Sequence, residues 1–212
     1  MSANSNVRGF VLAGGASRRF GRDKALVEFY SEPLIARLCR TLQTATDAPV
    51  RIIGDAEKYA TTGVECIADS WPGEGPLGGI IAALTADDSD AETADRYSWS
   101  LIIGCDMPFL TVEWLKYLVA RALASKAEVI VPESNHGLEP LCACWRQSSE
   151  STLKRAFNAG TRRVTDAMKQ LPMEVLDAAE WKRFDNFDRL FWNMNTPADY
   201  EEAIRLMKAE HP

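Results

Sequence analysis

The sequence lacks any long hydrophobic run. In its 212 residues, no stretch approaches the roughly 20 consecutive apolar residues that a membrane-spanning helix needs. The opening segment, MSANSNVRG, has neither the basic part nor the apolar part of a secretory signal. These absences predict a cytoplasmic protein with no membrane partner.

The sequence also has no C-x-x-C pair of cysteines and few histidines. The five cysteines lie far apart or without C-x-x-C spacing, at positions 39, 66, 105, 142 and 144. This pattern disfavours a disulfide scaffold or a zinc site and predicts reduced, mostly packed thiols. One of only two histidines, His136, lies in the polar segment SNHG, where we interpret it as a solvated side chain rather than a catalytic base.

Positive charge is in deficit. The chain has 24 Lys and Arg against 30 Asp and Glu, a formal net charge of −6. Binding to nucleic acid or to anionic lipid relies on a positive field, so neither partner is expected. An anionic ligand would have to be held by a local group of cations. The hydrophobic fraction of 46% is sufficient for a sizeable core.

Apolar strand-like segments alternate with helical periodicity along the first 130 residues. This alternation predicts an α/β fold with three layers, in which helices cover both faces of a mostly parallel central sheet. No linker or repeat divides residues 1–212, so we predict a single domain. Ligands of such sheets bind beyond the carboxyl ends of the strands. The predicted strands are 7–12, 50–53, 64–68, 99–104, 127–132, 138–145 and 172–177.

The loop after the first predicted strand has the strongest functional signal. Its sequence, LAGGASRRFGRDK, contains three glycines (14, 15 and 21) and four cations (Arg18, Arg19, Arg22 and Lys24). Glycines let backbone N–H groups enclose phosphate oxygens, and cations offset the charge of a polyanion. The loop fits neither G-x-x-x-x-G-K-[ST] nor G-x-G-x-x-G. We interpret it as a phosphate-binding loop, the alternative being a flexible basic loop with ordinary turn glycines.

Two aspartates follow predicted strands. Asp106 comes directly after WSLIIG, and Asp69 follows VECIA. Carboxylates at the ends of strands suit Mg²⁺, which takes one or two protein carboxylates together with phosphate oxygens. We expect both aspartates to face one cleft. A structural role in a turn is the alternative for Asp106.

Three further segments are candidate ligand contacts. In Gly75–Gly79, small residues begin a helix and would admit a flat base or a sugar near free N–H donors. The pair Arg162 and Arg163 would meet a second anion or form a surface pair at a helix start. Asn193 and Asn195 alternate, which predicts that both face the same side, as ligand contacts or as turn residues.

Six segments in order resemble the MobA-type molybdenum cofactor guanylyltransferases. They are LAGGASRRFGRDKAL, ADS with GPLGGI, CDMPF, EPLCA, AGTRRV and FWNMNTPAD. The resemblance implies a Rossmann-like nucleotidyltransferase fold. It also implies an activity that uses Mg²⁺ and GTP to attach GMP to the terminal phosphate of molybdopterin, with release of pyrophosphate. Proteins that deliver the cofactor, and molybdoenzymes that receive it, are further implied partners.

The resemblance also assigns roles to residues. It implies catalytic roles for Lys24, Arg19 and Asp106, with Asp106 as the Mg²⁺ ligand. The implied nucleotide contacts are Leu12, Ala13, Gly14, Gly15, Lys24, Gly54, Asp69, Pro76 and Asp106. The implied contacts on the pterin side are Arg162, Arg163, Asn193 and Asn195. The sequence departs from the family pattern at Phe20, where methionine is common, and at Gly54, where some members have a nucleotide-contacting asparagine.

Alternatives to GMP transfer remain within the same fold. Cytidylyltransferases tend to have L-A-A-G in place of L-A-G-G and lack G-P-L-x-G, so Gly14 and Pro76 favour guanine. Sugar-phosphate nucleotidyltransferases usually have R-x-x-P-x-T before the lysine, which is absent here. A non-catalytic nucleotide-binding adaptor is a third alternative, and the presence of Lys24, Asp69 and Asp106 argues against it.

Overall fold

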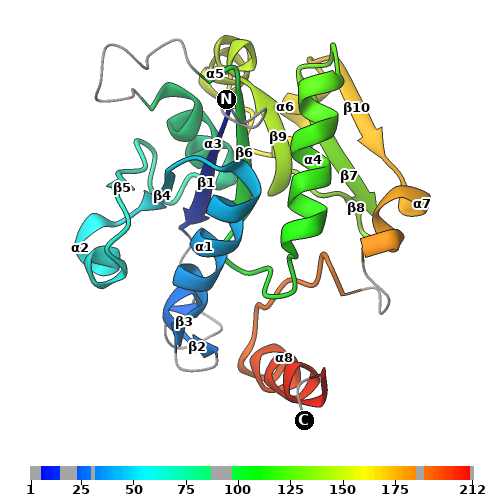
Figure 1. Ribbon diagram of the computed structural model, residues 1–212. Helices are drawn as coiled ribbons and strands as arrows, with labels where there is room; N and C mark the ends of the chain where they lie inside the picture. Colours follow the sequence, from blue (N-terminus) through cyan, green and yellow to red (C-terminus); the bar gives the residue numbers. More distant parts are fainter. Residues whose placement is uncertain (1–5, 15–22, 30–31, 87–96, 185–188, 211–212) are drawn as a thin grey trace.

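An eight-stranded sheet forms the centre of the protein (Figure 1). The computed structural model describes residues 6–14, 23–29, 32–86, 97–184 and 189–210. Within these residues the strand order is β10-β7-β9-β6-β1-β4-β5, and β8 pairs with β7. The strands are β1 (Val7–Ala13), β4 (Val50–Gly54), β5 (Cys66–Ile67), β6 (Trp99–Gly104), β7 (Val129–Ser134), β8 (Gly137–Leu138), β9 (Cys142–Arg146) and β10 (Met173–Leu176). A separate short pair joins β2 (Glu28–Phe29) to β3 (Glu32–Pro33).

Most neighbouring strands in the sheet are parallel. The β1–β4, β1–β6, β4–β5 and β10–β7 pairs run parallel, whereas β9 is antiparallel to β6 and β7. The carboxyl ends of the parallel strands therefore lie at one edge of the sheet, at the bottom of Figure 1. The prediction of an α/β fold with a mostly parallel sheet is confirmed.

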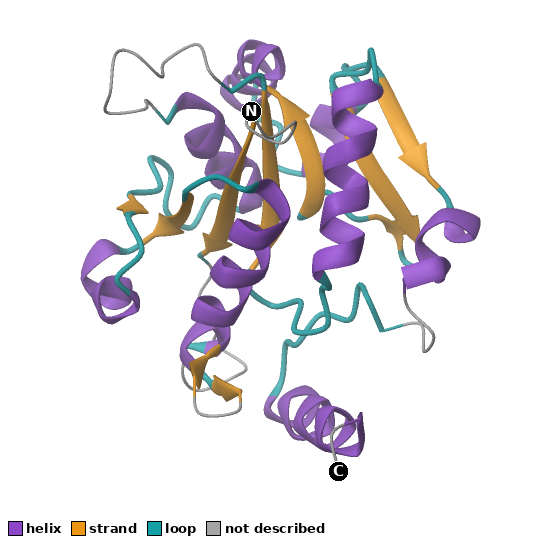
Figure 2. Ribbon diagram, viewed as in Figure 1, coloured by secondary structure: helices purple, strands orange, loops and turns teal. Residues whose placement is uncertain are grey.

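Helices cover both faces of the sheet (Figure 2). Side chains of successive residues in β1 point to opposite faces, so Val11 packs with the layer of α1 and α4, while Phe10 and Leu12 pack with the layer of α3 and α5. All of β1 is buried, as expected for a strand inside a covered parallel sheet. The helices are α1 (Leu34–Thr46), α2 (Ala56–Tyr59), α3 (Pro76–Thr85), α4 (Val112–Ala124), α5 (Glu150–Asn158), α6 (Val164–Met168), α7 (Ala178–Trp181) and α8 (Pro197–Glu210).

Two predicted strands are wrong in their extent. The segment 138–145 is divided, because β8 pairs with β7 as a hairpin and β9 begins only at Cys142. Pro140 lies in the break, and proline has no N–H to donate to a strand ladder. The segment 64–68 contains only the two-residue strand β5, which has a single neighbour because it lies at the edge of the sheet.

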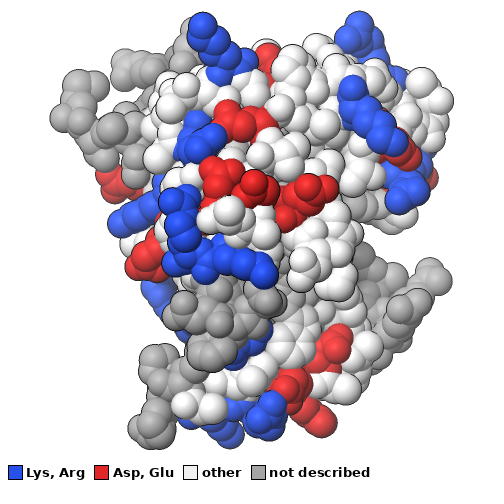
Figure 3. All heavy atoms as spheres, turned by 90° about the vertical axis from the view of Figure 1, so that its right-hand side faces the viewer, with Lys and Arg blue, Asp and Glu red and all other residues white. Residues whose placement is uncertain are grey.

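The described surface mixes charges of both signs. On the face shown in Figure 3, acidic and basic side chains lie beside one another. Arg121 of α4, for example, pairs with Glu174 of β10 and with Glu180 of α7. Such pairs offset part of the positive charge on this face. Among the described residues, none of the helices combines the length and apolar character required to cross a membrane.

Thr111 provides a test of the local sequence signal for α4. Its Oγ accepts a hydrogen bond of 3.2 Å from the backbone N of Trp114, which is the bond that an N-cap threonine makes. Thr111→Ala is expected to cost about 1 kcal/mol, which corresponds to a fall in Tm of about 2–4 °C in a domain of this size. Thr44→Ala is the control, because the Thr44 hydroxyl donates only within α1. Equal melting temperatures for the two variants would contradict the capping role.

Candidate functional site

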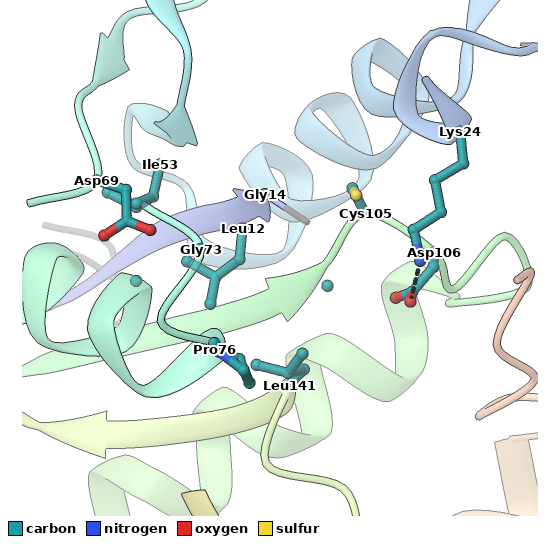
Figure 4. A pocket seen from close by; sticks show the side chains of 13 residues that line it. Leu12, Gly14, Lys24, Ile53, Asp69, Gly73, Pro76, Cys105, Asp106 and Leu141 are labelled. Carbon is teal, nitrogen blue, oxygen red and sulfur yellow. Dashed lines mark hydrogen bonds and ion pairs between the residues drawn. The ribbon is translucent and has the colours of Figure 1, made fainter. Parts of the chain in front are cut away.

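A cavity of about 330 Å³ lies at the carboxyl ends of β1, β4 and β6. Parallel strands end together here, and in open α/β sheets this edge is where ligands bind. Figure 4 shows Asp69 at one end of the cavity, Lys24 and Asp106 at the other, and Leu12 and Pro76 between them. The sequence-predicted residues that line it are Leu12, Gly14, Lys24, Asp69, Pro76 and Asp106.

Lys24 and Asp106 form an ion pair at one end of this cavity. The Nζ atom of Lys24 donates to Oδ2 of Asp106 at 2.7 Å, and only 15% and 17% of the two side chains are exposed. The same Nζ donates to Oδ1 of Asn195 at 3.2 Å. Three residues that are far apart in the sequence therefore meet at one ammonium group. A cation held in this place can bind an anionic ligand in the cavity.

The end of β6 fixes the position of Asp106. A Cβ atom at position 104 would lie 2.7 Å from Oδ1 of Asp106, so a side chain at this position would force the carboxylate to shift. The backbone N of Met194 donates to the backbone O of Asp106 at 2.8 Å. Gly104 was not predicted from the sequence, although it stands two residues before Asp106 at the end of a strand. Its contribution is steric.

Cys105 also lines the cavity but is not a nucleophile there. Burial, followed by the nearby Asp106 carboxylate, raises the pKa of the Cys105 thiol to about 12. The reactive form of cysteine is the thiolate, which is nearly absent at neutral pH when the pKa is this high. The prediction of packed thiols is also confirmed for Cys142 and Cys144, which are fully buried.

The start of α3 forms one wall of the cavity. Gly75 adopts a φ of +94°, a conformation that favours glycine, and Pro76 is the first helical residue. Within the part of the chain that the structure describes, no side-chain hydrogen bond caps this helix, which leaves its first N–H groups available to a ligand. Nearby, Oδ1 of Asp69 accepts a hydrogen bond of 2.9 Å from the backbone N of Trp71. The bond orders the turn that leads to α3.

A second cavity, of about 450 Å³, adjoins the first. The two share Gly14, Asp69 and Gly73, and the second is also lined by Ala13 and Gly54. The predicted nucleotide contacts that fall on described residues thus line one of two adjoining cavities. Arg19 and Gly15, which were also predicted, lie outside the described residues.

The adjacent residues Arg162 and Arg163 make different contacts and do not converge on one place. Arg162 donates through Nε to Glu74 at 2.6 Å and through NH1 to the backbone O of Phe157 at 2.8 Å. Its guanidinium lies over the Phe157 ring, 4.1 Å from the centroid. Arg162 therefore links the segment before α3 to α5, whereas Arg163 is exposed at the N-cap of α6.

The prediction that Asn193 and Asn195 face the same side is wrong. Asn195 contacts Lys24, whereas Asn193 donates to the backbone O of Phe191 and lines a third cavity, of about 300 Å³. That cavity also contains His136 and Trp192. Alternation predicts a shared face only in an extended strand, and this segment is not a strand.

Comparison with known proteins places the chain among nucleotidyltransferases. Residues 9–174 match the family model of the MobA-like NTP transferase domain. A protein of Opitutus terrae named probable molybdenum cofactor guanylyltransferase is 34% identical over 211 residues, which are 97% of this chain and 98% of that protein. A protein of Chloroflexus aggregans with the same name is 30% identical over 213 residues, covering 99% and 97% of the two chains.

A solved structure agrees with these relatives. The crystal structure of molybdopterin-guanine dinucleotide biosynthesis protein A from Archaeoglobus fulgidus superposes with a TM-score of 0.78 at 25% identity. The match covers 95% of this chain and 99% of that one. The family model spans most of the chain and the relatives span nearly all of it, so the chain belongs to the MobA-like NTP transferase family.

Proposed function

We propose that this nucleotidyltransferase transfers GMP from GTP to the terminal phosphate of a molybdopterin cofactor and releases pyrophosphate. The names of its relatives support this activity. The observation that carries the proposal is the Lys24–Asp106 pair, which faces a cavity walled by the open N-terminus of α3. An ammonium group and free N–H groups suit a polyphosphate, and the adjoining cavity leaves space for a nucleoside.

The residues divide between the two substrates. On the nucleotide side, Lys24 binds phosphate oxygens and Asp69 binds the nucleoside, while Leu12, Ala13 and Gly14 approach the base and the ribose. Asn195, a candidate for the pterin side, contacts the same ammonium group as Asp106, which supports a position next to the nucleotide phosphates. On the pterin side, Asn193 lines the third cavity. Arg162, beside the segment that leads into α3, and Arg163, at the start of α6, are the other candidates for the pterin side and lie outside this third cavity.

The reaction does not require a general base. A terminal phosphate monoester has a second pKa of about 6, so its attacking oxygen is largely deprotonated at neutral pH. That oxygen forms a bond to the α-phosphorus of GTP, and the bond to the leaving pyrophosphate breaks. The chain has to position two polyanions that repel each other and to offset the charge of the leaving group. Lys24 and the N–H groups of α3 serve that purpose.

Asp106 fits a magnesium ligand. Among the described residues, no group of three or more His, Cys, Asp or Glu side chains forms a complete metal cage. Mg²⁺ does not need one, because it usually binds through one or two carboxylates together with substrate phosphates and water. The Asp106 carboxylate lines the cavity beside Lys24, where such phosphates would lie. When bound there, the ion would offset charge on the phosphate oxygens.

Base selectivity tests the guanine assignment against cytidylyl transfer. We expect GTP to bind at least about tenfold more tightly than CTP, because each buried polar group left unpaired by the wrong base costs about 1–3 kcal/mol. Titration calorimetry of each nucleotide with Mg²⁺ measures the ratio. Equal affinities would contradict the guanine assignment. Release of pyrophosphate in the presence of the pterin substrate separates an enzyme from a nucleotide-binding adaptor.

A further inference from the structure

Tyr59 is a buried side chain whose hydroxyl contacts both the end of β1 and Asp23, the residue before Lys24. Only 3% of it is exposed. Its hydroxyl lies 3.0 Å from Oδ2 of Asp23 and 3.2 Å from the backbone O of Ala13. Burial, followed by the nearby Asp23 carboxylate, raises the pKa of the Tyr59 hydroxyl above its usual range. The hydroxyl therefore remains protonated at neutral pH and acts as a donor.

Asp23 connects Tyr59 to Lys24 because it caps the turn that begins at Lys24. Its Oδ1 accepts a hydrogen bond of 2.9 Å from the backbone N of Ala25, and its backbone O accepts one of 3.2 Å from Leu26. These bonds close a single 3₁₀ turn, η1 (Lys24–Leu26), of which Lys24 is the first residue. Lys58 pairs with the same carboxylate oxygen as Tyr59. The carboxylate of Asp23 thus fixes the turn that bears Lys24, and two side chains of α2 hold that carboxylate.

Gly54 makes room for this arrangement. A Cβ atom at position 54 would lie 2.6 Å from the backbone O of Ala13 and 2.9 Å from a ring carbon of Tyr59. The first contact is with backbone, which cannot move aside as a flexible side chain can. Glycine at position 54 therefore allows the Tyr59 ring to lie against the ends of β1 and β4. No nucleotide contact from a side chain is available at this position.

We propose that Tyr59 is a positioning residue for the nucleotide phosphates, acting through Asp23 and η1 to aim the Lys24 ammonium group into the cavity. The identity of the nucleotide rests on the function proposed above. The positioning itself applies to any polyphosphate that Lys24 binds. A hydrogen bond to a carboxylate is among the stronger ones in proteins, so its loss loosens the turn.

Tyr59→Phe tests the proposal, because it removes one oxygen and keeps the ring over Gly54. We expect the Kd values of GTP and of inorganic tripolyphosphate to rise by roughly five- to tenfold, less than for loss of a charge-assisted hydrogen bond made to the ligand itself, because Tyr59 acts through Asp23. Tyr117→Phe is the matched control. The Tyr117 hydroxyl also donates to a carboxylate, that of Glu180 at 2.7 Å, but lies on α4 away from the cavity. Its Kd values should stay within about twofold of those of the parent protein.

A double-mutant cycle separates positioning from a general loss of structure. In a Lys24→Ala background, Tyr59→Phe should change the Kd of tripolyphosphate by less than about twofold, because the group that it positions is gone. Equal effects of Tyr59→Phe in both backgrounds, or no effect in the parent, would overturn the proposal. Tripolyphosphate has no base, so a protein that fails to prefer GTP but shows this coupling would refute the guanine assignment and support the role of Tyr59.

Discussion

Asp106→Asn is expected to lower the turnover number by roughly 10²–10³, as for the loss of other preorganised charged or polar groups in active sites. The substitution keeps the size of the side chain but removes the charge that pairs with Lys24 at 2.7 Å. It also replaces a carboxylate oxygen by an amide, which is a weaker ligand for a hard dication. The rate of Mg²⁺-dependent pyrophosphate release, measured at saturating GTP, reports the effect.

The melting temperature shows whether a lower turnover number of Asp106→Asn reflects lost catalysis or lost folding. Asparagine retains the backbone oxygen that accepts the hydrogen bond from Met194, so we expect Tm to remain nearly unchanged. A purely structural role in the turn predicts the opposite, a lower Tm with normal turnover per folded molecule. Asp166→Asn is the control, because Asp166 pairs with Lys169 on an exposed part of α6. An active Asp106→Asn variant with an unaltered Mg²⁺ dependence would exclude the metal role.

Lys24→Ala is expected to weaken GTP binding by roughly ten- to a hundredfold, since hydrogen bonds to charged groups contribute about 1.5–3 kcal/mol. Among the described residues that line the main cavity, Lys24 carries the one cationic side chain. Without this ammonium group, Asp106 would face the incoming phosphates with no counter-charge. Repulsion then adds to the lost attraction. Calorimetric Kd values and steady-state rates should both change.

Lys154→Ala controls for the loss of one positive charge. Lys154 pairs with Glu150 on the surface of α5, and a pair of this kind contributes little. The affinity of this variant for GTP should match that of the parent protein. If Lys24→Ala bound GTP as tightly as Lys154→Ala, the phosphate-binding role of Lys24 would be wrong.

The fold was predictable because its signals are local. The run WSLIIG became β6, and the Thr111 cap begins α4, because apolar periodicity and capping depend on neighbouring residues. The prediction failed at 138–145, where Pro140 interrupts an apolar segment that otherwise has the composition of one strand.

The residues of the site were predictable only where functional residue types cluster in the sequence or follow a recognisable strand. Lys24 follows a group of glycines and cations, and Asp106 follows a buried strand, so both were candidates. Their pairing spans 82 positions, and the sequence alone does not encode such a distance. Asn193 and Asn195 were predicted to face the same side because alternation was applied to a segment that is not extended. Tyr59 was missed because its segment, AEKY, has no unusual composition, and its one sequence signal was glycine at position 54.

The contact between Asn195 and Lys24 has a consequence for the newly synthesised chain. The Lys24 ammonium group is held by Asp106, which lies 82 residues after it in the sequence, and by Asn195, which lies 171 residues after it. Ribosomes add residues in order, at about 5–20 per second, so these partners emerge at different times. A nascent chain that has exposed β6 but not residue 195 brings the first two groups together without the third. Competence to hold a polyphosphate in its final geometry is therefore acquired only after residue 195 has emerged from the ribosome.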